Sequence, residues 1–182
     1  MTTLTPERSG TSRASFYRAA REGKLERIAR GIYLPLDAPP ADFDQIEAAT
    51  RRSDATICLT SALAQHDLID TIPASLHIAI RSRSRIPATE GAITWHRFDR
   101  ASFELGRELI PIAGTDMTIG RYSAERSIAD AFRLRGEIGY EIARDALKEW
   151  LRRGGKPAQL LDFAERIPRA KGPMLTALEA LA

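Results

Sequence analysis

The sequence predicts an α+β protein of two parts, and three observations support that class. Within the first 36 of its 182 residues, a short basic helix runs directly into a basic hairpin. After a proline-rich segment, short apolar runs indicate a small mixed or antiparallel sheet. The last third carries apolar residues at helical spacing. We therefore expect a small unit at 1–38 and an α+β domain at 39–182, with the sheet before the C-terminal helices.

Local chemistry predicts the N-terminal helix. Thr11 or Ser12 can cap its first turn. Phe16 and Ala20 belong to an apolar stripe at helical spacing, and Gly23 ends the helix. The opposite face carries residue types suited to the DNA major groove, because Arg grips guanine edges or phosphates in a fork. These residues are Arg13, Ser15, Tyr17, Arg18 and Arg21.

The segment after Gly23 is expected to form a basic β-hairpin. Its turn falls at 29–31, where Gly31 supplies the permissive backbone. Four apolar residues are expected to face a core: Leu25, Ile28, Ile32 and Leu34. Three cations then remain in and around the hairpin: Lys24, Arg27 and Arg30. A basic helix followed by such a hairpin corresponds to the recognition helix and wing of a winged helix-turn-helix. The cations of the wing contact DNA phosphates.

Charge is concentrated in this N-terminal unit. Residues 1–36 hold seven cationic and three acidic side chains, whereas the rest of the chain has one more acidic than basic residue. An isolated helix with an arginine-rich face is usually only a solvated surface. The helix, the glycine stop and the basic hairpin together favour binding to double-stranded DNA. The predicted DNA-binding residues are Ser12, Arg13, Ser15, Tyr17, Arg18, Lys24, Arg27 and Arg30.

The larger part begins after a linker. Two consecutive prolines within 35–42 place a boundary near residue 38. Asp42 is expected to cap a helix that ends near Arg52. The predicted strands lie at 55–59, 76–80, 93–98, 110–112 and 117–122, and the last two form a hairpin over 113–116. A helix at 61–69 separates the first two strands.

The remaining helices are expected at 124–135, 140–153, 157–167 and 173–181. Gly136 is expected to stop the first of them, and a glycine pair at 154–155 follows the second. Pro157 and Pro173 open the last two, since proline is tolerated in the first helical turn.

Residues with catalytic or metal-binding chemistry are scarce. His66, His77 and His96 are too far apart for a recognisable metal motif, and no cysteine pair accompanies them. Cys58 has apolar neighbours that predict an inert, buried thiol in a strand. No glycine-rich phosphate loop is visible. We therefore expect no metal, no cofactor and no enzymatic activity.

Two charged segments leave alternatives open. A nuclease would use clustered carboxylates with a lysine, and only Glu22-Gly23-Lys24 offers that spacing. Exposed charges around a turn glycine explain this segment without catalysis. The run Arg81-Ser82-Arg83-Ser84-Arg85 follows a predicted strand. It is either a solvated loop, a second phosphate contact, or a surface for an acidic partner.

The compartment follows from what the chain contains. Its single cysteine cannot form an internal disulfide. The N-terminus lacks the apolar core of a signal peptide, and no apolar run approaches the roughly 20 residues that span a bilayer. These features predict a cytoplasmic protein without membrane association.

Three segments in order resemble a known family, the AbiEi-type antitoxins of abortive-infection, type IV toxin–antitoxin systems. The first is the helix and hairpin described above, especially Arg30-Gly31-Ile32-Tyr33. The second is Leu59-Thr60-Ser61-Ala62-Leu63 with the following strand at 76–80. The third is the segment 125–133, which reads Glu-Arg-Ser-Ile-Ala-Asp-Ala-Phe-Arg.

The resemblance implies a promoter-binding autorepressor that recognises repeated operator sequences and opposes a nucleotidyltransferase-like toxin encoded beside it. It assigns DNA binding to the N-terminal unit, with a possible homodimer on DNA. Segment 125–130 carries no catalysis over, and Arg126 and Asp130 are equally explained as a polar pair that fixes the helix against the sheet. The alternative is an antitoxin that binds its toxin directly through the C-terminal helices, around Phe132, Leu147, Trp150 and Leu151, with little DNA binding.

The chain departs from the family at its start. The family normally has a full helix before the turn that precedes the recognition helix, whereas here only residues 1–10 are present. The winged helix-turn-helix is therefore expected to be truncated. Either the true start lies upstream, or the module is minimal and packs on the second domain or a second subunit.

Overall fold

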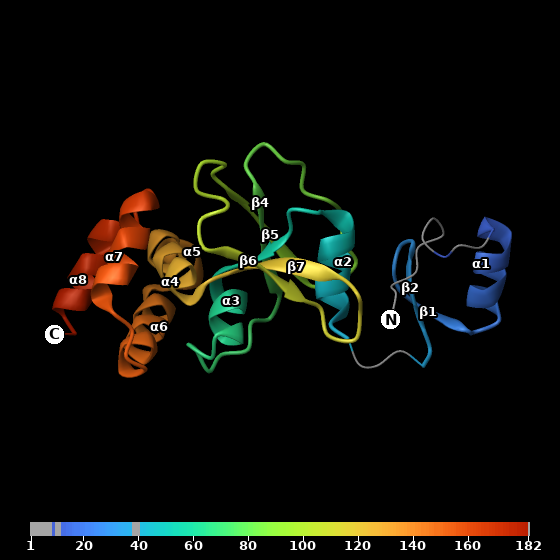
Figure 1. Cartoon of the computed structure of the whole chain (residues 1–182), viewed down its shortest axis with the longest axis horizontal. Coiled ribbons are helices and arrows are strands. Elements are labelled where there is room, and N and C mark those ends of the chain that lie inside the picture. Colours follow the sequence, from blue (N-terminus) through green and yellow to red (C-terminus); the bar gives the residue numbers. More distant parts are fainter. Residues whose placement is uncertain (1–8, 10–11, 38–40, 182) are drawn as a thin grey trace.

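The computed structural model describes residues 9, 12–37 and 41–181. Within them lie eight α-helices, a two-stranded hairpin and a five-stranded mixed sheet (Figure 1). The helices after the last strand gather at one end of the molecule, and the first helix and hairpin lie at the other. The predicted α+β class is confirmed.

The N-terminal helix α1 (Arg13–Arg21) begins where the sequence predicts. The Ser12 Oγ accepts a hydrogen bond from the Ser15 backbone N–H at 3.2 Å. Thr11, the alternative cap, lies outside the described residues. The helix ends at Glu22, and Gly23 follows with a φ of +72°. Because that backbone region is open to glycine at no steric cost, the predicted stop is confirmed.

The hairpin consists of β1 (Leu25–Ala29) and β2 (Ile32–Pro35), paired antiparallel. Ala29 pairs with Ile32, so the turn is Arg30–Gly31 and one residue shorter than predicted. Gly31 has a φ of +81°, as its expected role requires. Ile32 and Leu34 are buried as predicted, whereas Leu25 and Ile28 are only half-buried.

The hairpin packs against the larger part of the chain. Its buried residues Ala29, Ile32 and Leu34 share one apolar cluster with Ile46 of α2 (Phe43–Arg51) and with Ile57 of the sheet. Two polar contacts reinforce that packing. They join Arg51 Nη2 to the Arg30 carbonyl at 3.2 Å, and Arg27 Nη2 to Glu90 Oε1 at 2.9 Å. Asp42 caps α2 through a hydrogen bond from the Gln45 backbone, as predicted.

The sheet has the strand order β5-β4-β3-β7-β6. Its strands are β3 (Thr56–Ile57), β4 (Leu76–Arg81), β5 (Ile93–Phe98), β6 (Arg107–Pro111) and β7 (Thr118–Tyr122). The pairs β3–β7 and β4–β5 are parallel, and β3–β4 and β6–β7 are antiparallel. The central strand β3 is fully buried. The sheet is therefore mixed, one of the two predicted arrangements.

The predicted bounds of three elements in and near the sheet are wrong. The expected strand at 55–59 has only two residues, because Leu59 takes a φ of +49° and starts α3 (Leu59–Gln65). That helix therefore covers 59–65 instead of 61–69. The strand expected at 110–112 begins at Arg107, since Arg107 pairs with Tyr122 across the sheet. Cross-strand pairing here outweighs the polar character of the local sequence.

The C-terminal helices are α4 (Ala124–Arg133), α5 (Arg135–Ile138), α6 (Tyr140–Arg152), α7 (Pro157–Arg166) and α8 (Lys171–Glu179). The prediction that Gly136 stops α4 is wrong, because Gly136 lies inside α5. Gly139, with a φ of +96°, separates α5 from α6 instead. Pro157 opens α7 as predicted, but α8 begins two residues before Pro173. A proline at the third helical position is tolerated because the first turn lacks intrahelical partners for its N–H groups.

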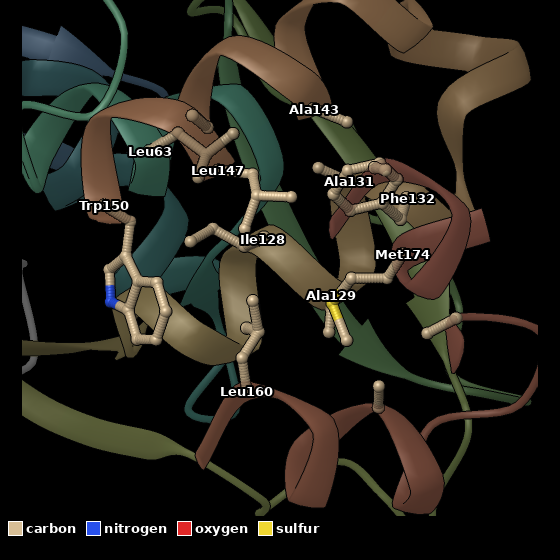
Figure 2. Packing of buried hydrophobic residues seen from close by; sticks show 14 of the residues in the cluster. Leu63, Ile128, Ala129, Ala131, Phe132, Ala143, Leu147, Trp150, Leu160 and Met174 are labelled. Carbon is tan, nitrogen blue, oxygen red and sulfur yellow. The ribbon is translucent and has the colours of Figure 1, made fainter. Parts of the chain in front are cut away.

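These helices form an apolar core of their own. Figure 2 shows Ile128, Phe132, Leu147, Leu160 and Met174 converging between α4, α6, α7 and α8. Each of these side chains is fully buried, and burial of one such side chain contributes about 1.5–3 kcal/mol. None of the helices in the described ranges is long and apolar enough to cross a bilayer.

A buried ion pair joins this core to the sheet. Arg126 Nε donates to Asp130 Oδ2 at 2.7 Å, and Arg133 Nε donates to the other oxygen, Oδ1, at 3.0 Å. Arg126 Nη1 donates to the carbonyls of Ser102 and Leu105, and its guanidinium lies 4.3 Å from the centroid of the Tyr122 ring. Arg126 and Asp130 are almost fully buried, which confirms the expected polar pair.

Candidate nucleic-acid interface

The exposed side of α1 is set by the packing of its other side. Phe16 is only 3% exposed, and its ring meets Tyr33 of β2 edge-on, with 5.1 Å between centroids. Residues four apart lie on the same side of a helix, so Arg13, Tyr17 and Arg21 form one exposed row. The structure therefore exposes cationic side chains beside the surface through which the hairpin holds the helix.

Arg18 lies beside this row. It is exposed, and in the described ranges its side chain makes no hydrogen bond or ion pair. Arg21 lies on the predicted basic face, although it is not among the predicted DNA-binding residues, and it has the same surroundings. Its spacing from Tyr17 and Arg18 was the signal that would have included it. Both guanidinium groups present their donors to solvent.

Tyr17 has a double role in the geometry. It is 41% exposed, yet its ring packs edge-on against Phe16 at 5.8 Å and against Tyr33 at 6.4 Å. Such aromatic pairs each add about 0.5–1.5 kcal/mol beyond the area they bury. Tyr17 therefore fixes α1 on the hairpin while it contributes to the exposed surface.

The two predicted serines lie at the start of α1. The Ser12 hydroxyl is occupied by the N-cap bond and lies 3.0 Å from the Ser15 hydroxyl. Both side chains are exposed, at the positive end of the helix dipole. Ser12 therefore acts mainly as the helix cap, and the Ser15 hydroxyl is the more available of the two for contact with DNA.

The three hairpin cations are spread along the chain: Lys24 precedes β1, Arg27 lies within it and Arg30 lies in the turn. Lys24 Nζ pairs with Glu22 at 2.7 Å, and Arg27 pairs with Glu90 at 2.9 Å, with all four side chains about half exposed or more. Exposed ion pairs of this kind contribute about 0–1 kcal/mol, so a phosphate can displace the carboxylate. Arg30 projects from the turn and, within the described residues, has no side-chain partner. The structure thus gathers Arg13, Tyr17, Arg18 and Arg21 on one helix but spreads the hairpin cations.

The described residues offer little support for a nuclease site, a reactive cysteine or a metal site. Glu22 and Lys24 pair with each other at the surface. Cys58 is fully buried, and this burial raises the pKa of its thiol well above the ordinary value. It follows β3 as the residue before α3, so the predicted burial is confirmed while its place inside a strand is not. No group of three His, Cys, Asp or Glu side chains in the described ranges is arranged to hold a metal.

Two histidines meet in a way that sequence spacing did not reveal. His77 of β4 and His96 of β5 stack with 5.1 Å between ring centroids, and their Nδ1 and Nε2 atoms are 2.9 Å apart. Burial, with smaller effects from His77 and Arg133, lowers the pKa of His96 to about 4. Parallel pairing of β4 with β5 creates this contact, and only that register could have predicted it.

Comparison with known proteins adds no relative. The sequence matches no protein-family model, and a search of curated proteins gives no match.

Proposed function

We propose that this chain is a sequence-specific DNA-binding transcriptional repressor, a binding protein without catalytic activity that acts in the cytoplasm. In this proposal α1 is the recognition helix and the β1–β2 hairpin is the wing of a winged helix-turn-helix. One observation carries it: Arg13, Arg18 and Arg21 are exposed on α1, while the aromatic contacts of Phe16 and Tyr17 hold that helix on a basic hairpin.

The proposed contacts divide into two kinds. Arg13, Ser15 and Arg18 would enter the major groove, where guanidinium groups read guanine edges. Lys24, Arg27 and Arg30 would hold the hairpin on phosphates or in the minor groove, which positions the helix without reading sequence. Packing of Ile32 and Leu34 against α2 supports this arrangement, because it gives the hairpin a fixed base.

The resemblance to AbiEi-type antitoxins extends the proposal. It supports repression of the chain's own operon through repeated operator sequences, with a homodimer on DNA. It also supports an antitoxin role against a neighbouring nucleotidyltransferase-like toxin.

A second candidate is an antitoxin that binds its toxin directly. An open groove of about 1100 Å³ lies between residues 67–71 and α6, and its apolar lining includes the half-buried Ile69, Ile142 and Leu151. That groove favours a protein contact. Phe132 and Leu147 cannot provide it as first expected, because both are fully buried in the helical core.

A mobility-shift titration separates the two candidates. The protein is titrated against the DNA upstream of its own gene, with random DNA as competitor, at about 50 and 200 mM salt. We expect a specific shift that weakens steeply with salt. No shift at either salt concentration would contradict the repressor and favour the protein-binding antitoxin.

Arg18→Ala tests the base-reading role within that experiment. The variant should lose about 1–3 kcal/mol of binding free energy on the specific site and less on random DNA. The matched control is Arg166→Ala, which removes an exposed arginine without a described partner from α7. Equal weakening on both DNAs would leave Arg18 as a phosphate contact only.

A further inference from the structure

A second basic site lies on the larger part of the chain. A cavity of about 270 Å³ is lined by Arg52, Arg81, Arg83 and Arg100, together with three serines. Asp54 is the single carboxylate in its lining. Residues 81–84 of the arginine–serine run at the end of β4, whose role the sequence left open, line this cavity.

The topology explains why these residues meet. Strands β4 and β5 are adjacent and parallel, so the segments that follow them leave the same edge of the sheet. Arg83 follows β4 and Arg100 follows β5, and the segment between α2 and β3 brings Arg52 to the same place. Loops beyond the carboxyl ends of parallel strands are a common location for ligand binding.

The charges in the cavity are only partly neutralised. Asp54, 7% exposed, accepts from Arg52 Nε at 2.9 Å and lies 3.7 Å from Arg81 Nη1. Arg81 also pairs with Glu104. By contrast, Arg83 and Arg100 are exposed, and neither side chain has a hydrogen bond or ion pair within the described ranges. Two guanidinium groups therefore remain available beside two that are already positioned.

Two adjacent residues at the end of α2 make hydrogen bonds, one to the loop after β4 and one to the hairpin. Arg52 Nη2 donates to Ser84 Oγ at 3.0 Å. Its neighbour Arg51 donates to the carbonyl of Arg30 at 3.2 Å, at the hairpin turn. Arginines thus lie at the turn of the proposed wing, at the end of α2 and in the loop after β4. Two of them are partly neutralised, Arg51 by Glu47 and Arg52 by Asp54. Figure 1 shows α2 between the hairpin and the sheet.

That loop is also held in place. The carboxylate of Glu47, only 2% exposed, accepts hydrogen bonds from the backbone N–H groups of Glu90 and Gly91, at 3.1 and 2.9 Å. A Cβ atom on Gly91 would lie 2.0 Å from Asp44 Oδ1, so the backbone approaches α2 as closely as glycine permits. These contacts fix the end of the loop that leads into β5. The end that carries the arginines is held at Ser84, whose hydroxyl accepts from Arg52 and whose carbonyl accepts from Arg97 Nε at 3.1 Å.

We propose that this cavity binds the phosphodiester backbone of the same DNA duplex that α1 and the hairpin contact. The inference rests on the proposed function, and it extends the DNA-contacting surface beyond the wing. Guanidinium and hydroxyl groups are the usual protein partners of DNA phosphates, and an open cationic site suits a continuous polyanion. The contacts add affinity and fix orientation without reading sequence.

The double variant Arg83→Ala/Arg100→Ala tests this inference. Both side chains are exposed and lack described partners, so folding is expected to be unchanged. Binding to the upstream DNA and to random DNA is followed by fluorescence anisotropy from 50 to 200 mM salt. Each lost phosphate contact lowers the salt slope by about 0.9, so the wild-type loss of affinity over that range should become about tenfold smaller in the variant.

The control Lys156→Ala/Arg166→Ala removes the same charge from exposed positions of α7 and its N-cap, and should keep the wild-type slope. A wild-type slope in Arg83→Ala/Arg100→Ala, with specific binding still lost in Arg18→Ala, would overturn this inference and leave the proposed function intact. A reduced slope with no effect of Arg18→Ala would instead remove α1 from the interface and keep the cavity. If poly-glutamate binding, but not DNA binding, is lost in the double variant, the cavity belongs to an acidic protein partner and the inference fails.

Discussion

Arginine has opposite surroundings at the two ends of this molecule. In α4, Arg126 is 1% exposed, and its donors meet Asp130 and two backbone carbonyls. In α1, Arg18 is exposed and has no side-chain partner among the described residues. The difference shows that arginine content alone does not identify a binding surface. Where the donors are satisfied internally the side chain stabilises the fold, and where they face solvent it is available to a partner.

The largest expected effect is on the buried side of this comparison. Arg126→Ala would leave Asp130, which is 0% exposed, with Arg133 as its one remaining ion-pair partner among the described residues. Removal of one partner from a buried ion pair costs about 3–5 kcal/mol. Urea denaturation should therefore show a large loss in the free energy of unfolding for Arg126→Ala. Arg18→Ala should stay within about 0.5 kcal/mol of the wild type, as exposed substitutions usually do.

The double variant Arg126→Ala/Asp130→Ala tests why Arg126→Ala is destabilised. If the uncompensated carboxylate is responsible, the double variant should be less destabilised than the sum of the two single variants. Equal stability of Arg126→Ala and Arg18→Ala would contradict the comparison itself, because both arginines would then be dispensable for folding.

A smaller effect is expected from pH, and only in the larger part of the chain. The pKa of His96 is about 4 in the folded protein, against 6.5 for the free side chain, chiefly because the ring is buried. Burial lowers the pKa of His77 as well. Arg133 also disfavours the charged form of His96, whereas Glu137, whose Oε2 lies 3.9 Å from His96 Nδ1, opposes this.

The direction in which the free energy of unfolding changes with pH follows from proton binding. Between pH 6.5 and 4 the unfolded chain binds more protons at His96 than the folded chain, so the free energy of unfolding falls as the pH falls through this window. With allowance for partial solvent screening, the free energy of unfolding should fall by about 2 kcal/mol across this window. His96→Gln should remove most of it in urea titrations at pH 7, 5.5 and 4. An unchanged pH profile would mean that the histidine pair does not carry the dependence.

Local chemistry could be predicted from the sequence. The caps at Ser12 and Asp42 and the stop at Gly23 depend on residues within one helical turn, and all three are found in the structure. The strand at 93–98 and the exposed arginine face of α1 follow from periodicity alone. Such features are encoded over a few residues, so no knowledge of the rest of the fold is needed.

Features that depend on distant residues could not be predicted. Leu59 starts a helix with a positive φ, which no local propensity favours. Arg27 pairs with Glu90, which is 63 positions away, so its hairpin role could not be separated from packing against the sheet. The histidine contact and the basic cavity both depend on the parallel register of β4 and β5. Sequence predicted which arginines could bind, but only the fold shows which donors remain unused.

The smallest expected effect compares two helix caps of the same geometry. Ser12 caps α1 and Ser123 caps α4, and each hydroxyl accepts a backbone N–H at 3.2 Å. Loss of an N-cap costs about 0.5–2 kcal/mol. For Ser123→Ala we expect a loss of that size in the global free energy of unfolding, because α4 lies in the core. For Ser12→Ala the global value should change less, since α1 packs mainly through Phe16, while amide exchange in the first turn of α1 should become faster. Equal losses in the global free energy of unfolding would show that α1 unfolds together with the sheet. The exposed arginines of α1 would then belong to a helix that is as stable as α4.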